Sequence, residues 1–467
     1  RSVVNITMND SSIMLDELVV TAMGIKKERK ALGYAVQDVK SEELMKSKTS
    51  NILNSLTGKI AGVSVISKGG APGEGATIRI RGVGTLSNSE KSNPLIVVDG
   101  VPMDDISFLN TQDIESISVL KDASSAAVYG ARAAFGVVLI TTKTPDKDKT
   151  SITYSGDFAF KTPTTVPDFV TDGYTYSERF YEAYSAWNNY SATPKNINKS
   201  QTFSTAWLDT FKQRKEQGIT DEYEIGSNGE YIYYGNTDYM KELYKDQTFA
   251  QDHNLSVSGS NGKLNYYVSG RYYGYDGLFR YNTDTYNTLN LRAKGSLQVF
   301  DWLRIDNNTD YSNLEYHNPL NVGEGGSIWR NIADEGHPSS PLFNPDGSLT
   351  MSGAYTIGDF IYGKNGLDTH KRILKNTTGF AAKFLDNKLR VNGDFTFSNT
   401  DNNSTQIRVP VPYSKVKDET IWLSTKYNDL KESVRATNYM AMNLYTEYEE
   451  TFLDSHYFKG MVGYNYE

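Results

Sequence analysis

The sequence predicts a small α+β domain followed by a large antiparallel β-sheet of the type that closes into a transmembrane β-barrel. Up to Lys143, short apolar strands alternate with segments that favour helices. After Lys143, apolar and polar residues alternate with period two over long runs that turns separate. The chain also combines 33 tyrosines with a mean hydropathy of −0.52. Such values suit strands that carry one polar and one apolar face.

Length and composition exclude several classes of protein. The 467 residues are more than one core usually holds, so we expect two units. A net charge of −8 and the lack of a basic patch with interleaved aromatic residues argue against nucleic-acid binding. The absence of cysteine removes disulfides and thiolate metal sites. No apolar run reaches about 18 residues, which excludes a transmembrane helix, and the start at Arg1 does not resemble a signal peptide.

The first domain begins with two short helices and a strand. Ser41–Leu44 has the pattern of a capped helix start. A second helix is expected over Ser50–Leu56, and Gly58 should end it. The run Val63–Ile66 predicts a strand, which the glycine pair at 69–70 terminates.

A strand and a turn follow. Thr77–Arg81 alternates, which places Arg79 and Arg81 on one strand face that water would solvate. The glycines from 69 to 84 do not form a phosphate loop, because no Gly-Lys-Ser/Thr sequence opens a helix there. Pro94–Gly100 predicts a buried strand, and an Asp-Gly turn explains Asp99 better than a catalytic or metal-binding role.

The segment Thr111–Lys143 comes directly before the point where short strands and helical segments are replaced by long strands of period two. It contains a strand at Ile117–Leu120 and a compact helical turn at Ala123–Ala127. Gly130 should close that turn with a positive φ. Val137–Ile140 is apolar throughout and predicts a strand buried on both faces.

This segment resembles the end of the plug domain in SusC/RagA-type TonB-dependent outer-membrane transporters. The matching steps are Lys121–Ser125, Tyr129–Arg132 and Gly136–Lys143. Phe135 departs from the pattern, because the family usually has asparagine there. The resemblance implies a plug domain inside a barrel of about 22 strands.

The resemblance also implies how the chain is divided. Residues 1–14 would be the tail of an N-terminal β-sandwich extension, and 15–24 would hold the TonB box. The plug would occupy 25–146. The transmembrane barrel would begin at 147 and run to 467, with long extracellular loops at about 162–251 and 317–368.

The segment proposed as the TonB box has charges at one end and β-branched residues at the other. Alone it reads as an edge strand or a linker, but its position before the plug favours β-augmentation with a strand of TonB. The polar and basic run Gly24–Lys30 after it predicts a connector. The resemblance further suggests that Arg79 and Arg81 face acidic groups on the barrel wall. The box residues are Leu15, Asp16, Glu17, Leu18, Val19, Val20 and Thr21.

The second part of the chain predicts about nine barrel strands. Asn261-Gly262 is a hairpin signal, and Leu289–Val299 shows the clearest alternation. Tight turns are expected at Phe300-Asp301 and Asp386-Asn387, and a last hairpin pairs 433–450 with 456–467. Several strands exceed the about 9 to 11 residues that cross a bilayer. Nine strands would leave two open edges in lipid, so we expect a fragment of a longer protein.

We find no pattern that predicts catalysis or metal binding. Asp306, Asn308 and Asp310 have the opening spacing of a calcium loop, but Tyr311 replaces the turn glycine and His317 the bidentate glutamate. The five histidines are scattered, without a metal-binding pair or a triad order. We therefore expect no enzyme activity and no cofactor.

By resemblance, the chain imports nutrients across the outer membrane of a Gram-negative bacterium. TonB would energise import, and a SusD-like lipoprotein would cover the loops. Whether two transporter–lid pairs associate as a dimer is left undecided by the resemblance. Oligosaccharides are the first expected substrate and peptides the second. A secreted or surface β-rich glycan-binding or structural protein is an alternative from another class. Aromatic residues of the first long loop could stack on sugars, namely Trp187, Tyr190, Trp207, Tyr231, Tyr233 and Tyr234.

Overall fold

The computed structural model describes most of the chain after residue 150 and a large part of what precedes it. The described residues are 18–20, 26–28, 36–45, 52–67, 76–82, 93–103, 106, 109–122, 127–144, 150–322, 327–453 and 456–467. The chain forms two compact units. Unit 1 comprises Arg1–Ser151, Val257–Ser269 and Ala293–Asp306, and unit 2 comprises Ile152–Ser256, Gly270–Arg292 and Asn307–Glu467.

A five-stranded sheet forms the centre of the first domain. Its order is β3-β8-β9-β6-β7, with β6 and β9 parallel and the other neighbours antiparallel. The two-stranded sheet of β4 and β5, which is separate from it, and short helices accompany it. The elements are α1 (Ser41–Met45), α2 (Ile52–Ser55), β3 (Val36–Lys40), β4 (Val63–Ser67), β5 (Ala76–Ile80), β6 (Leu95–Val98), β7 (Val101–Met103), β8 (Ile114–Leu120) and β9 (Val137–Thr142).

Local sequence signals explain this domain. Residues 137–140 of β9 are all buried, as a strand covered on both faces requires. Asp99 and Gly100 have φ values of 50° and 87°, which confirms the predicted turn between β6 and β7. Gly130 has a φ of 60°, as predicted. The predicted turn Ala123–Ala127 lies mostly outside the described residues.

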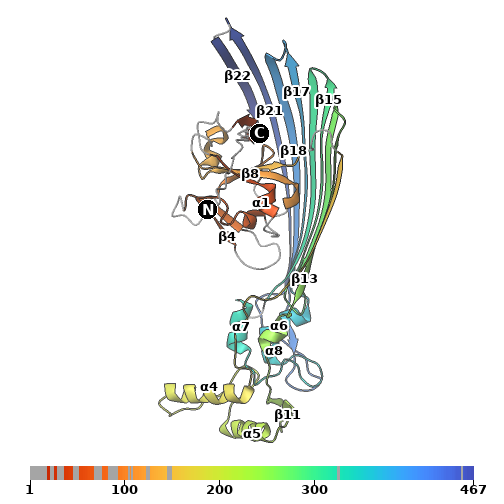
Figure 1. Ribbon diagram of the computed structural model, residues 1–467. Helices are drawn as coiled ribbons and strands as arrows, with labels where there is room; N and C mark the ends of the chain where they lie inside the picture. Colours follow the sequence, from red (N-terminus) through yellow and green to blue (C-terminus); the bar gives the residue numbers. More distant parts are fainter. Residues whose placement is uncertain are drawn as a thin grey trace, which may run out of the picture. The chain divides into compact units, whose positions relative to one another are not determined.

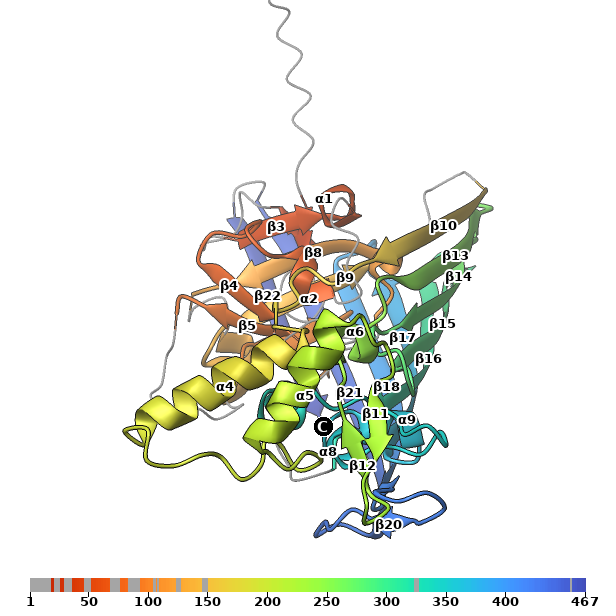
Figure 2. The ribbon, with the colours of Figure 1, turned by 90° about the horizontal axis from the view of Figure 1, so that it is seen from below.

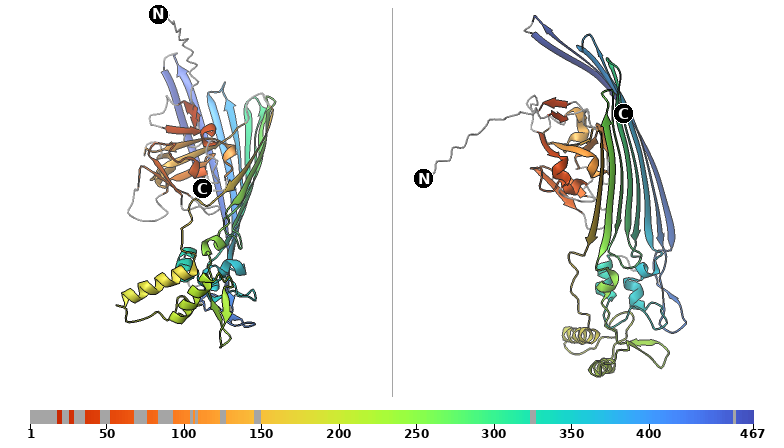
Figure 3. Two further views of the ribbon diagram at one scale, coloured as in Figure 1. Left: turned by 60° about the horizontal axis from the view of Figure 1, so that its bottom comes forward. Right: turned by 45° about the vertical axis from the view of Figure 1, so that its right-hand side comes forward.

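A nine-stranded antiparallel sheet forms the second architectural element (Figures 1 and 3). Its order is β10-β13-β14-β15-β16-β17-β18-β21-β22, so β10 and β22 are its edges. The number of strands confirms the sequence prediction, and β21 reaches 24 residues. The strands are β10 (Ser151–Lys161), β13 (Thr248–Ser260), β14 (Leu264–Asp276), β15 (Thr285–Phe300), β16 (Leu303–Pro319), β17 (Gly366–Phe384), β18 (Leu389–Arg408), β21 (Asp429–Phe452) and β22 (His456–Tyr466).

Short and long connections alternate along this sheet. The turns after β13, β15 and β17 span residues 261–263, 301–302 and 385–388, and β22 begins four residues after the end of β21. Asn261 stabilises the first of them, because its side-chain oxygen accepts a hydrogen bond from Leu264 N at 2.8 Å. The connections after β10, β16 and β18 are much longer, at 162–247, 320–365 and 409–428. Short turns therefore gather at one end of the strands and long loops at the other, as in outer-membrane barrels.

The two faces of the sheet differ in polarity, in the opposite sense to a soluble protein. Leu289 and Leu291 on β15 are 39% and 47% exposed, whereas Asn290 and Arg292 between them are each 6% exposed. We call the exposed side the apolar face and the other the polar face. The predicted alternation of β15 is thereby confirmed. Within the described residues, no helix is long and apolar enough to span a membrane.

Four polar residues interrupt the apolar face and satisfy one another. Asn307 donates to Thr378 at 2.8 Å, and Thr378 donates to Asn376 at 3.0 Å. Asn376 donates to Thr309 at 2.8 Å, and Thr309 donates back to Asn307 at 2.9 Å. This closed ring lies between β16 and β17, so each of the four side chains has hydrogen-bond partners within the sheet.

The long connections fold into a domain of their own (Figure 2). Leu243 from the first, Ile357 from the second and Val411 from the third share one buried cluster. The third connection was not predicted as a long loop. The elements are α4 (Gly173–Trp187), α5 (Thr205–Glu216), β11 (Tyr223–Ile225), β12 (Tyr231–Tyr233), α6 (Tyr239–Leu243), α7 (Ile328–Glu335), α8 (Met351–Thr356), α9 (Gly358–Tyr362), β19 (Pro412–Tyr413) and β20 (Ile421–Trp422).

Candidate functional site

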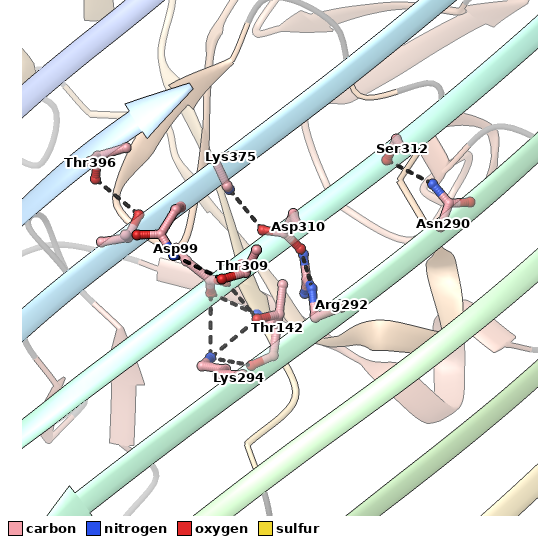
Figure 4. Close-up of polar contacts among 12 residues, drawn as sticks. Asp99, Thr142, Asn290, Arg292, Lys294, Thr309, Asp310, Ser312, Lys375 and Thr396 are labelled. Carbon is pink, nitrogen blue, oxygen red and sulfur yellow. Dashed lines mark hydrogen bonds and ion pairs between the residues drawn. The ribbon is translucent and has the colours of Figure 1, made fainter. Parts of the chain in front are cut away.

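The polar face of the large sheet carries a network of buried charges (Figure 4). Arg292 on β15 pairs with Asp310 on β16, and Lys375 on β17 lies 3.4 Å from the same carboxylate. The side chains of Arg292 and Lys375 are 5% and 3% exposed. Two buried cations that share one carboxylate depend on it for charge compensation, and its loss would leave both charges uncompensated.

Neighbouring strands extend this polar surface. Arg271 on β14 makes two hydrogen bonds to Asp252 on β13, at 2.8 and 2.7 Å. Asn290 donates to Ser312 at 2.9 Å, as Figure 4 also shows. Bidentate Arg–carboxylate pairs fix the orientation of both groups. The face is therefore a rigid, densely paired polar wall.

Two residues of this wall contact the first domain, and both contacts lie within unit 1. Lys294 on β15 donates to the carbonyl and hydroxyl oxygens of Thr142 at 3.3 and 3.2 Å, and lies 3.9 Å from Asp99 (Figure 4). Thr142 in turn donates to both oxygens of Asp99, at 3.0 and 2.6 Å. Tyr267 on β14 donates to Asp113 at 2.8 Å.

Part of the predicted TonB box is an ordered strand. Leu18–Val20 forms β1, which pairs antiparallel with β2, Lys26–Glu28. The prediction of a connector across Gly24–Lys30 is wrong at Lys26–Glu28, because the backbone of these three residues pairs with β1 in a sheet. Of the predicted box, Leu15–Glu17 and Thr21 lie outside the described residues.

The two arginines predicted to face the barrel wall occupy different backbone positions. Arg79 lies in β5, which ends at Ile80, and Arg81 follows with a φ of 58°. Arg81 forms an ion pair of 2.6 Å with Asp122, within the first domain. Its pairing with an acidic group of the barrel wall stays a prediction.

The predicted sugar-binding aromatic residues separate into two groups. Trp187, the last residue of α4, and Tyr190, which follows the helix, are 88% and 77% exposed. The other four, Trp207, Tyr231, Tyr233 and Tyr234, are each at most 7% exposed.

Local contacts show that the buried group belongs to the loop core. The indole of Trp207 donates to the carbonyl of Tyr233 at 3.1 Å, and the hydroxyl of Tyr233 donates to Asn344 at 2.8 Å. Burial, followed by the nearby Glu224, raises the pKa of Tyr234 to about 12. These rings therefore hold the loops together, and a ligand would have to displace that packing to stack on them.

Sequence reasoning missed the wall residues Lys294, Tyr267 and Lys375. The alternation placed Lys294 on the polar face but gave no sign of its partners, since Thr142 lies 152 residues away and Asp99 farther still. Asp306, Asn308 and Asp310, weighed as calcium ligands, lie in strand β16. Among the described residues, no group of three or more potential ligands is arranged to hold a metal.

Comparisons with known proteins agree with this architecture. The model of the TonB-dependent receptor plug domain matches residues 28–137. The TonB-dependent receptor SusC of Bacteroides thetaiotaomicron is 32% identical over 362 residues, which cover 75% of this chain and 31% of SusC. The chain belongs to the SusC/RagA-type TonB-dependent receptors.

A second TonB-dependent receptor and a solved structure are also similar to this chain. The TonB-dependent receptor P39 of Formosa agariphila is 42% identical over 162 residues, covering 34% of this chain and 15% of P39. The solved structure of the RagAB peptide importer in its open-open state superimposes with a TM-score of 0.73 at 21% identity. That alignment covers 96% of this chain and 48% of the RagAB chain. The receptor chain described here thus spans about a third of the length of SusC.

Proposed function

We propose that this receptor serves TonB-dependent active import of oligosaccharides across the outer membrane of a Gram-negative bacterium. The observation that carries the proposal is a plug domain joined to a sheet whose exposed face is apolar and whose buried face is polar. In this role the apolar face contacts lipid and the polar face lines the path. A secreted β-rich glycan-binding or structural protein would have no reason to expose such a face to water.

TonB would act at the segment that contains β1. A partner strand can add to the edge of β1 that β2 does not use, and main-chain hydrogen bonds would supply the affinity. A SusD-like lipoprotein is the proposed lid over the loop domain, and a dimer of transporter–lid pairs is the proposed assembly.

The choice of oligosaccharides rests on the exposed pair Trp187 and Tyr190, which suits stacking on sugar rings. Peptides are the second candidate. The RagAB structure belongs to a peptide importer, and its likeness to this chain supports the shared fold.

Deletion of Leu18–Thr21 in the full-length protein tests the proposal. Cells would receive single oligosaccharides or single peptides as the limiting nutrient, with the surface abundance of the receptor measured in parallel. We expect growth on one oligosaccharide to be lost at normal surface abundance. If every nutrient that requires the intact gene is still used, TonB does not act through this segment.

A second variant tests the substrate class. Replacing both Trp187 and Tyr190 with alanine should lower uptake of that oligosaccharide about thirtyfold, because each stacking ring contributes on the order of 1 kcal/mol. Trp422, which is 56% exposed on β20, provides a matched control for the loss of an exposed indole. Loss of growth on peptides alone would favour the second candidate.

A further inference from the structure

Helix α4 is held in the loop domain through two of its faces. Successive residues of a helix are turned by about 100°, so Tyr174 and Tyr181 lie on one face and Tyr176 and Phe180 lie on the nearly opposite one. The first face packs within its own connection, where the ring of Tyr181 lies 5.1 Å from that of Phe203. The second face packs against a different connection.

That second face lies against His337, which belongs to the connection between β16 and β17. The imidazole centroid lies 4.9 Å from the ring of Tyr176 and 6.2 Å from the ring of Phe180. His337 is 8% exposed. This aromatic contact therefore joins the first long connection to the second.

The surroundings of His337 do not suit a charged ring. The ring makes a hydrogen bond to the backbone of Ile197, whereas Nδ1 is buried and has no hydrogen-bond partner in the part of the chain that the structure describes. A proton on Nδ1 would thus create a buried N–H group without an acceptor. Aromatic rings attract cations, but burial dominates here and lowers the pKa of His337.

The charged groups around this contact do not reverse that effect. Asp334 favours the charged imidazole, but less than burial opposes it. Lys199 and Glu335 form an ion pair of 3.2 Å, so their charges offset each other. On α4, burial raises the pKa of the Tyr176 phenol. The contact between α4 and His337 is therefore made by neutral groups near pH 7.

We propose that His337 is an acid-sensitive contact, which holds α4 through Tyr176 and Phe180 when neutral and releases this face of the helix when protonated. Its consequence for import rests on the proposed function. Since α4 ends at Trp187 and Tyr190 follows it, release of the helix would disorganise the proposed sugar-stacking pair. The contact would then reduce sugar binding in acid.

The direction of this pH dependence follows from the two states of the ring. Above the ordinary histidine pKa of 6.5, the ring is neutral both when α4 is docked and when it is released, so docking is complete. As the pH falls through that value, the released ring takes up a proton while the docked ring, whose pKa is lower, does not. Release therefore becomes more favourable as the pH falls, until the docked ring is protonated as well.

Hydrogen exchange of the full-length receptor in detergent tests this contact. Between about pH 7.5 and about pH 5.5, exchange in α4 should rise by up to about tenfold after correction for intrinsic rates, because one ring takes up at most one proton. The variant His337→Phe keeps an aromatic ring but cannot be protonated, so the rise should disappear. His370→Phe is the matched control, because His370 is exposed on β17, and here the rise should remain. The same rise in His337→Phe, or none in the wild type, would overturn the proposal.

The wild-type receptor decides the question if His337→Phe does not accumulate. Its exchange should begin to rise as the pH falls through about 6.5 and should rise more in α4 than in α5. An equal rise in both helices, or a rise that begins only near about pH 4, where carboxylates titrate, would show that His337 is not responsible. Neither experiment uses a substrate or TonB. Failure of the Trp187 and Tyr190 uptake test would therefore count against sugar binding and leave the acid response of α4 standing.

Discussion

Asp310 is the side chain on which the buried charges of the polar face depend. It is the shared partner of Arg292 and Lys375, whose own side chains are almost fully buried. Removal of a shared partner leaves charge without compensation in a medium that solvates it poorly.

We therefore expect Asp310→Asn to destabilise the receptor by about 3 kcal/mol. The midpoint of urea unfolding from lipid vesicles would measure the change. Asp306→Asn is the control, because Asp306 pairs with Arg304 in an exposed position and should contribute less than about 1 kcal/mol. Equal midpoints for the two variants would show that the Asp310 network adds no stability.

Single residues also mark what the sequence could and could not predict. The turn at Asp99-Gly100 and the positive φ of Gly130 depend on neighbouring residues, so local chemistry predicted them. The burial of Trp207 and Tyr233 depends on contacts with distant segments such as the one that contains Asn344. The sequence does not distinguish an exposed aromatic residue from one in a core. For that reason the six candidate sugar-binding rings include four that are buried.

Helix α4 illustrates how tightly the loop elements pack. It begins at Gly173, after the N-cap Asp172, whose side chain accepts from Thr175 N at 2.7 Å. A Cβ at Gly173 would lie 2.0 Å from the carbonyl oxygen of Gly235 and 3.0 Å from Phe211. The start of α4 and the segment around Gly235 therefore approach more closely than any side chain permits.

Gly173→Ala should loosen the loop domain by about 1 to 3 kcal/mol, because the added methyl group forces these segments apart. Limited proteolysis of the loops, together with tryptophan fluorescence, would report the change. Gly295→Ala on β15 is the control, since its Cβ would meet nothing nearer than 3.8 Å. Proteolysis of Gly173→Ala at the control rate would contradict this account.

The strands were predictable as elements, whereas the loop domain was not. Period-two alternation and the Asn261-Gly262 turn are local, and they gave the sheet with its hairpins. The helices of the connections pack through a cluster assembled from three loops, which no local pattern reveals. The segment 409–428 carries two strands of two residues each, too short for an alternation signal.

At the scale of the whole molecule, the large sheet exposes apolar side chains and buries polar ones, and this reversed polarity suits contact with lipid better than contact with water. In the proposed role, Leu291 faces hydrocarbon, and Leu291→Arg should cost about 2 to 4 kcal/mol. The yield of folded receptor in lipid vesicles would measure this. Ser296→Arg, on the polar face of the same strand, is the control and should fold with a yield near that of the wild type. If both variants fold equally well, the exposed apolar face is not in contact with lipid.

The shared core of the three long connections has a consequence for how such receptors diversify. Leu243, Ile357 and Val411 come from different loops but fill one volume. A change of size at one of them alters the space available to the other two. Substitutions at these positions should therefore be correlated across related sequences, so the three long connections would evolve as a single unit while each strand hairpin varies on its own.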